Sequence, residues 1–160
     1  MVIMNKSKVV SLSLHHSGKI LLALYANGML RLWNMMTARC TFKRKVGLLD
    51  ENEPEESEAE EGEEGGEDEL FEVALSKKDL SEQDRQVVEV KWEPKFGKIY
   101  AILFRKMLEV YTVEDEKACS TAIFDVISTS FDFIGPNQIC VANENGNFCI
   151  LKNIQDNESI

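Results

Sequence analysis

The spacing of apolar and polar residues along the chain predicts short β-strands. Segments 10–14 and 88–92 alternate apolar and polar residues, as expected for strands with one buried face. Segments 20–25 and 99–104 are continuous apolar runs, typical of strands covered on both faces. Asn27-Gly28 and later Asn145-Gly146 predict hairpins, because a two-residue turn with both φ angles positive favours Asn-Gly. The pattern therefore predicts an all-β protein.

The strand pattern occurs three times, over residues 9–34, 87–111 and 127–151. The first two copies superpose with one insertion and one deletion, both in turns, so that residues 18–20 align with residues 97–99. The second and third copies begin about 40 residues apart, and the first and second begin 78 residues apart. Removal of about 40 residues around an acidic segment restores one period, so we interpret the chain as a repeat protein.

A fourth apolar stretch follows the first two copies, at residues 39–43 and 118–124. Four short strands in about 40 residues are typical of a WD40-type β-propeller blade. An all-β sandwich with evenly spaced strands is the alternative, and the shared register of the copies favours blades. Closure takes about four to eight blades. We therefore expect a fragment of a seven-bladed propeller, with self-association into a closed ring as the alternative.

This interpretation divides the chain into four parts. Residues 1–45 are expected to form a blade together with the first strand of the next. Residues 46–86 form an acidic, mostly disordered insertion, with a short helix expected near residues 77–85. Residues 87–126 form a second blade, and residues 127–160 form a third blade and a C-terminal tail.

Specific segments resemble one WD40 family. Residues 12–20 are similar to the entry of a WD40 blade, with His16 where proline is usual. Residues 30–43 resemble the corresponding blade of the p21-activated kinase-interacting protein family. Residues 87–111, with Pro94 among them, resemble its next blade, and residues 127–151 the blade after that. The resemblance covers nearly all of the chain outside residues 46–86.

The resemblance implies a non-catalytic scaffold in large (60S) ribosomal subunit biogenesis and pre-rRNA processing. It implies a location in the nucleus and nucleolus, and pre-60S assembly factors or ribosomal proteins as partners. Animal members of the family are also linked to inhibition of p21-activated kinase. A negative regulator that binds this kinase is therefore an alternative.

The formal net charge of −10 has an uneven origin. Residues 50–72 hold 14 acidic residues and no basic one, and the remaining residues carry a positive excess of four charges. Such a segment cannot bury enough apolar surface to offset its ordering entropy, so we expect it to be disordered. It is either a solvated loop or a docking arm, which would make the protein an acidic-arm chaperone of basic proteins. Ser57 within it is a candidate phosphosite for an acid-directed kinase.

Four basic residues precede this segment: Arg39, Lys43, Arg44 and Lys45. We take them as candidate partner-binding residues. They suit a nuclear-targeting or RNA-facing patch, with any RNA contact indirect. Alternatively, they keep an edge strand soluble.

No motif in the sequence indicates catalysis, a cofactor or a metal. The adjacent His15 and His16 fall in a turn, where neighbouring residues rarely aim at one metal ion, and even a structural role for this pair is doubtful. The phosphate-binding and nucleophile motifs of common enzymes are absent. The four scattered cysteines are expected to be buried or half-buried free thiols in a reducing compartment. The protein is therefore not expected to be an enzyme.

Two further expectations concern packing and membranes. The aromatic side chains of Trp92, Tyr100, Phe104 and Tyr111 are expected to pack between blades. No run of 18 apolar residues exists, the first six residues are not a convincing signal peptide, and no membrane partner is expected.

Overall fold

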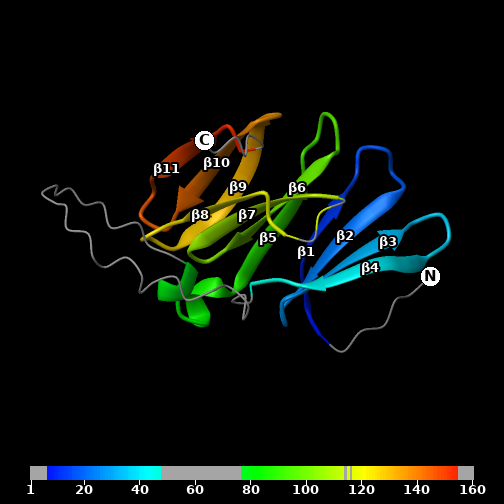
Figure 1. Cartoon of the computed structure of the whole chain (residues 1–160), viewed down its shortest axis with the longest axis horizontal. Coiled ribbons are helices and arrows are strands. Elements are labelled where there is room, and N and C mark those ends of the chain that lie inside the picture. The colour runs from blue at the N-terminus through cyan, green and yellow to red at the C-terminus, as the bar shows by residue number, and fades with distance from the viewer. Residues whose placement is uncertain (1–6, 48–76, 114, 116, 155–160) are drawn as a thin grey trace, which may run out of the picture.

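The computed structural model describes residues 7–47, 77–113, 115 and 117–154. Within them, eleven strands form three antiparallel sheets that lie side by side (Figure 1). The first sheet has the order β1-β2-β3-β4 and comprises Val9–Leu14, Ile20–Tyr25, Met29–Asn34 and Arg39–Lys45. The second has the order β5-β6-β7-β8 and comprises Val87–Trp92, Ile99–Phe104, Met107–Thr112 and Ser120–Ile123. The third has the order β11-β10-β9 and comprises Ser128–Gly135 (β9), Gln138–Asn143 (β10) and Phe148–Lys152 (β11).

The three sheets coincide with the three predicted repeats, so the all-β prediction is confirmed. One boundary differs. Residues 1–45 were expected to include the first strand of the next blade, but β4 pairs with β3 and completes the first sheet. The short helix expected near residues 77–85 is present as two 3₁₀ turns, Lys77–Asp79 and Gln83–Arg85.

The two hairpin turns are in the predicted places but have a different geometry. Gly28 and Gly146 have φ angles of 82° and 86°, whereas neither Asn27 nor Asn145 has a positive φ. Three residues connect β2 to β3, and four connect β10 to β11. In these longer connections a single glycine adopts the left-handed conformation that lets the chain rejoin the sheet. The prediction of a two-residue turn with both φ angles positive was therefore wrong.

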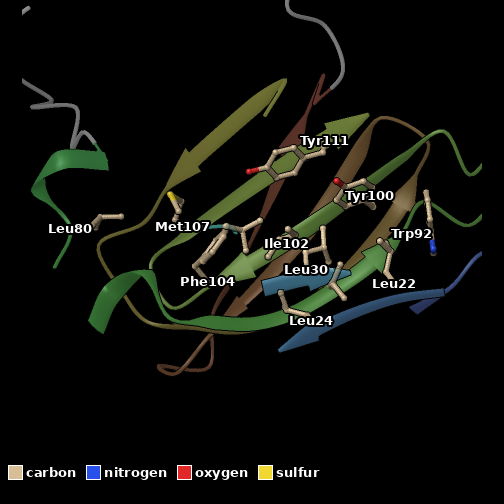
Figure 2. Packing of buried hydrophobic residues seen from close by; sticks show 12 residues of the cluster. Leu22, Leu24, Leu30, Leu80, Trp92, Tyr100, Ile102, Phe104, Met107 and Tyr111 are labelled. Carbon is tan, nitrogen blue, oxygen red and sulfur yellow. The ribbon is translucent and has the colours of Figure 1, made fainter. Parts of the chain in front are cut away.

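The second sheet is covered on both faces. All six residues of β6 are buried. Tyr100, Ile102 and Phe104 belong to the core against the first sheet, and the alternate residues belong to the core against the third. Figure 2 shows side chains of both sheets meeting in the first of these cores. The continuous apolar run at residues 99–104 thus reflects burial on both faces of the strand, as expected from the sequence.

The four aromatic residues expected between blades are all in the core between the first and second sheets. Trp92, Tyr100, Phe104 and Tyr111 are buried there. Trp92 meets Tyr100 edge-on at 5.5 Å between ring centroids, and Tyr100 stacks on Tyr111 at 5.5 Å. This prediction is confirmed.

The outward faces of the two end sheets remain apolar. Leu12 of the first sheet is 58% exposed, and Phe148 of the third is 68% exposed. Within the part of the chain that the structure describes, each end sheet has one neighbouring sheet only. Cys40, Cys119 and Cys140 are half-buried free thiols, but Cys149 is exposed. The burial predicted for Cys149 was wrong because it lies on β11, the outer strand of the third sheet.

Polar side chains of the first sheet bind the backbone of the second. The hydroxyl of Ser13 accepts a hydrogen bond from the Trp92 N–H at 2.9 Å, and Ser11 does the same for Val90 at 3.1 Å. Nε2 of His15 lies 3.1 Å from the Gly97 carbonyl oxygen, and the His15 ring meets Trp92 edge-on at 4.8 Å. His15 therefore has a structural role, joining two sheets, which the sequence had left in doubt.

The contact between His15 and Gly97 gives a first prediction. Gly97 has a φ of 65°, and a Cβ atom added there would lie 2.1 Å from His15 Nε2. Gly97→Ala should lower the free energy of unfolding by about 2–3 kcal/mol, since a left-handed alanine costs about 1–2 kcal/mol and the displaced imidazole loses a hydrogen bond worth about 1 kcal/mol. Denaturant unfolding measures the loss.

Gly18→Ala is the matched control for this substitution. Gly18 has a φ of 75°, but an added Cβ would meet no atom within 4 Å. Its substitution should therefore lower the free energy of unfolding only by the cost of an alanine in the left-handed conformation. Equal losses for Gly18→Ala and Gly97→Ala would contradict the role given to His15.

Candidate protein-interaction site

Exposed and half-buried side chains alternate along strand β4. Arg39, Lys43 and Lys45 are exposed, as is Thr41 between them. The side chains in between, Cys40, Phe42 and Arg44, are half-buried. Because β4 is the outer strand of the first sheet, the three exposed cations form a basic strip, Arg39–Lys43–Lys45, on an open sheet edge.

Arg44 was predicted as a partner-binding residue, but it is engaged in contacts within the protein. Its guanidinium lies 4.6 Å from the Tyr111 ring centroid and 4.9 Å from that of Phe42. It donates hydrogen bonds to the Tyr100 hydroxyl at 3.4 Å and to the Asp115 carbonyl oxygen at 2.5 Å. The alternation of the strand turns Arg44 toward the second sheet, so it joins the two sheets while its neighbours face solvent.

The phenols beside Arg44 are held in their neutral form. Burial raises the pKa of Tyr100, and the charge of Arg44 opposes that rise. Burial also raises the pKa of Tyr111, and the charge of Glu109 raises it further. The Tyr111 hydroxyl donates a hydrogen bond to Glu109 Oε2. A phenol that stays protonated remains a donor to this carboxylate.

An ion pair between a buried carboxylate and a half-buried lysine lies next to these phenols. The side chain of Glu109 is 2% exposed, and its Oε1 lies 3.0 Å from Lys77 Nζ. Sequence reasoning missed this pair. The available signal was a single acidic residue in a strand that is apolar on both faces, since a charge in such a place needs a partner. Lys77 begins the 3₁₀ turn that follows the acidic residues 50–72, so the pair fastens this turn to the second sheet.

The described segments on either side of the acidic residues 50–72 are also packed together. Arg85 Nη1 donates a hydrogen bond to the Gly47 carbonyl oxygen at 2.6 Å. Leu80 is buried in the core between the first and second sheets. Lys45 and Arg85 line a surface pocket of about 580 Å³ beside the Asn27 turn. Ser57 and the acidic residues 50–72 lie outside the described residues.

The described residues contain neither a cluster of metal-ligating side chains nor a membrane-spanning helix. Among them, no group of three or more His, Cys, Asp or Glu side chains could hold a metal ion. No helix in these residues is long and apolar enough to cross a membrane.

Comparisons with known proteins identify the fold. No protein-family model matches the sequence, and no curated protein does. Among solved structures, the β-propeller domain of Cps50 (Swd1) from Myceliophteria thermophila matches 95% of this chain with a TM-score of 0.62 and 9% sequence identity. The chain folds as three blades of a WD40-type β-propeller. It spans 38% of the Swd1 propeller domain.

The propeller fold orders the strands of each blade. The first strands of successive blades lie next to one another, β1 beside β5 and β5 beside β9. The fourth strand of the first blade, β4, therefore lies on the outer side, and the basic strip is a feature of the propeller rim. At 9% identity, the likeness to Swd1 shows the fold alone.

Proposed function

We propose that the chain is a non-catalytic WD40 scaffold that binds protein partners during large (60S) ribosomal subunit biogenesis, in the nucleus and nucleolus. The fold supports a protein-interaction role in general, because WD40 propellers typically present their loops and rims to other proteins. The resemblance of residues 12–20 and 30–43 to the p21-activated kinase-interacting protein family supports the ribosomal assignment.

The observation that carries the proposal is the basic strip on the rim. Arg39, Lys43 and Lys45 are exposed together on an outer strand of the first blade. Cations in such an array attract acidic partners and speed their association. They give a rigid blade a charged surface to which protein partners can bind. Binding of this kind involves no catalytic step.

Sedimentation and affinity purification test the proposed function. The tagged chain, expressed in cells, should co-sediment with pre-60S particles on a sucrose gradient and should concentrate in nucleoli. Purification should enrich pre-60S assembly factors or ribosomal proteins. Enrichment of p21-activated kinase without pre-60S factors would overturn the ribosomal proposal in favour of kinase regulation.

A control separates these outcomes from simple attraction between charges. Lys19→Glu/Lys98→Glu changes two exposed lysines on other turns and alters the net charge by four units. This variant should co-sediment as the unaltered chain does. Its loss from the pre-60S fractions would mean that net charge alone drives the association.

A further inference from the structure

Basic residues are unevenly distributed over the outer strands of the three blades. Strand β4 carries four of them in seven positions, whereas β8 has none and β11 has Lys152 only. Charges on an edge strand commonly prevent unwanted pairing with other chains. Strand β8, the fourth strand of the second blade, is an outer strand as well and carries no charged residue. Protection of the sheet edge alone therefore does not explain the basic residues of β4.

The spacing of the cations matches an extended chain. Lys43 and Lys45 are two residues apart on one side of the strand, which corresponds to about 6.6–6.8 Å. Arg39 lies four residues before Lys43, beyond a bulge at Thr41 that breaks the alternation. A peptide in β conformation repeats its side chains at the same interval, so acidic residues at every second position would meet Lys43 and Lys45 in register.

The backbone of β4 has one free edge. Within the described residues, β3 is its only paired neighbour. The other edge therefore presents backbone N–H and C=O groups that an added strand can pair with. The contacts of Arg44 with Tyr100 and Tyr111 fix β4 to the second blade, so this edge is held in place before a partner arrives.

We propose that β4 binds an extended acidic peptide of a partner protein as a fifth strand of the first blade. The peptide backbone pairs with the open edge, and its carboxylates pair with Lys43 and Lys45. This inference rests on the proposed scaffold function and names the kind of partner segment that the scaffold takes. A nucleic acid fits less well, because phosphate groups only accept hydrogen bonds and leave the edge carbonyl groups unpaired.

A defined peptide tests the proposal. The probe is a fluorescein-labelled nine-residue peptide that alternates Glu with Val, and its binding to the full chain is measured by fluorescence anisotropy. Lys43→Glu/Lys45→Glu should weaken binding by about tenfold or more, since like charges then oppose the peptide. Lys19→Glu/Lys98→Glu has the same total charge change away from β4 and should alter binding by less than about twofold. Equal losses in the two variants would overturn the proposal.

Two further probes separate strand pairing from simple charge attraction. N-methylation of alternate residues on one edge of the peptide keeps its charge and removes backbone donors, so it should abolish binding. If the methylated peptide binds equally well, or a single-stranded RNA of equal charge binds more tightly, β4 is a polyanion site and the proposal is overturned. If the peptide binds only after the acidic residues 50–72 are neutralised, the occupant is this chain's own segment, which also overturns it.

These outcomes are independent of the test of the proposed function. If the peptide does not bind while the chain still co-sediments with pre-60S particles, the strand-pairing inference alone fails. If the peptide binds as expected while the chain is absent from these particles, the docking edge stands and the ribosomal assignment fails.

Discussion

Phe104→Ala will lower the free energy of unfolding by about 3–5 kcal/mol, the usual cost of removing a large aromatic side chain from a core. Phe104 is 0% exposed and ends β6, in the core between the first and second blades. Its ring lies against Gly47, where an added Cβ atom would come within 3.0 Å of Phe104 Cε1. Alanine would leave a cavity there and would also loosen the segment that leads into the acidic insertion.

Chemical denaturation followed by tryptophan fluorescence measures this loss, since Trp92 lies in the same core. Phe96→Ala is the matched control, because Phe96 is 52% exposed on the turn between β5 and β6. It should change the free energy of unfolding by no more than about 0.5 kcal/mol. A loss for Phe104→Ala as small as that for Phe96→Ala would mean that the first two blades do not share a cooperative core.

Local patterns were sufficient to predict the strands and their grouping into blades. Alternation in residues 10–14 and the apolar run in residues 99–104 depend on which faces of a strand are covered, and this information lies within a few residues. The turn geometry at Asn27-Gly28 was missed because the number of connecting residues, and not the dipeptide alone, selects the turn type.

The division of the basic residues was also present in the sequence. Cys40, Phe42 and Arg44 alternate with Arg39, Thr41, Lys43 and Lys45. In a strand with a period of two, this order separates Arg44 from the exposed cations. Grouping all four cations as one site overlooked the alternation. Apart from Phe42 on the same strand, the partners of Arg44 lie in the other blade, 56 residues away in the case of Tyr100, and local sequence cannot identify them.

Contacts between segments that are far apart in the chain could not be predicted from the sequence. His15 meets Gly97 across 82 residues, and Lys77 reaches Glu109 from the far end of the acidic insertion. Each contact depends on how two blades stack, which is set by the whole packed core. A polar residue in an apolar strand indicates that some partner exists, but it does not indicate which residue that is.

Glu109→Ala will lower the free energy of unfolding by about 2–4 kcal/mol, because it leaves the buried Tyr111 hydroxyl without an acceptor and removes the partner of the half-buried Lys77 ammonium. Lys77 Nζ would lose the carboxylate 3.0 Å away, and the Tyr111 hydroxyl would lose its acceptor. Leu80, which follows the 3₁₀ turn at Lys77–Asp79, would remain packed in the core. Glu144→Ala is the control, since Glu144 is exposed, and should cost no more than about 0.5 kcal/mol.

The combined variant Lys77→Met/Glu109→Leu/Tyr111→Phe distinguishes an ion pair that stabilises the fold from one that is costly only when broken. All three polar groups are removed together, so no buried charge or hydroxyl remains without a partner. Replacement of a buried ion pair by apolar residues of similar volume is often neutral or stabilising. We therefore expect the triple variant to recover most of the stability that Glu109→Ala loses, as measured by denaturant unfolding. A triple variant as unstable as Glu109→Ala would show that the pair itself, and not the avoidance of an unpaired charge, stabilises the contact between the insertion and the second blade.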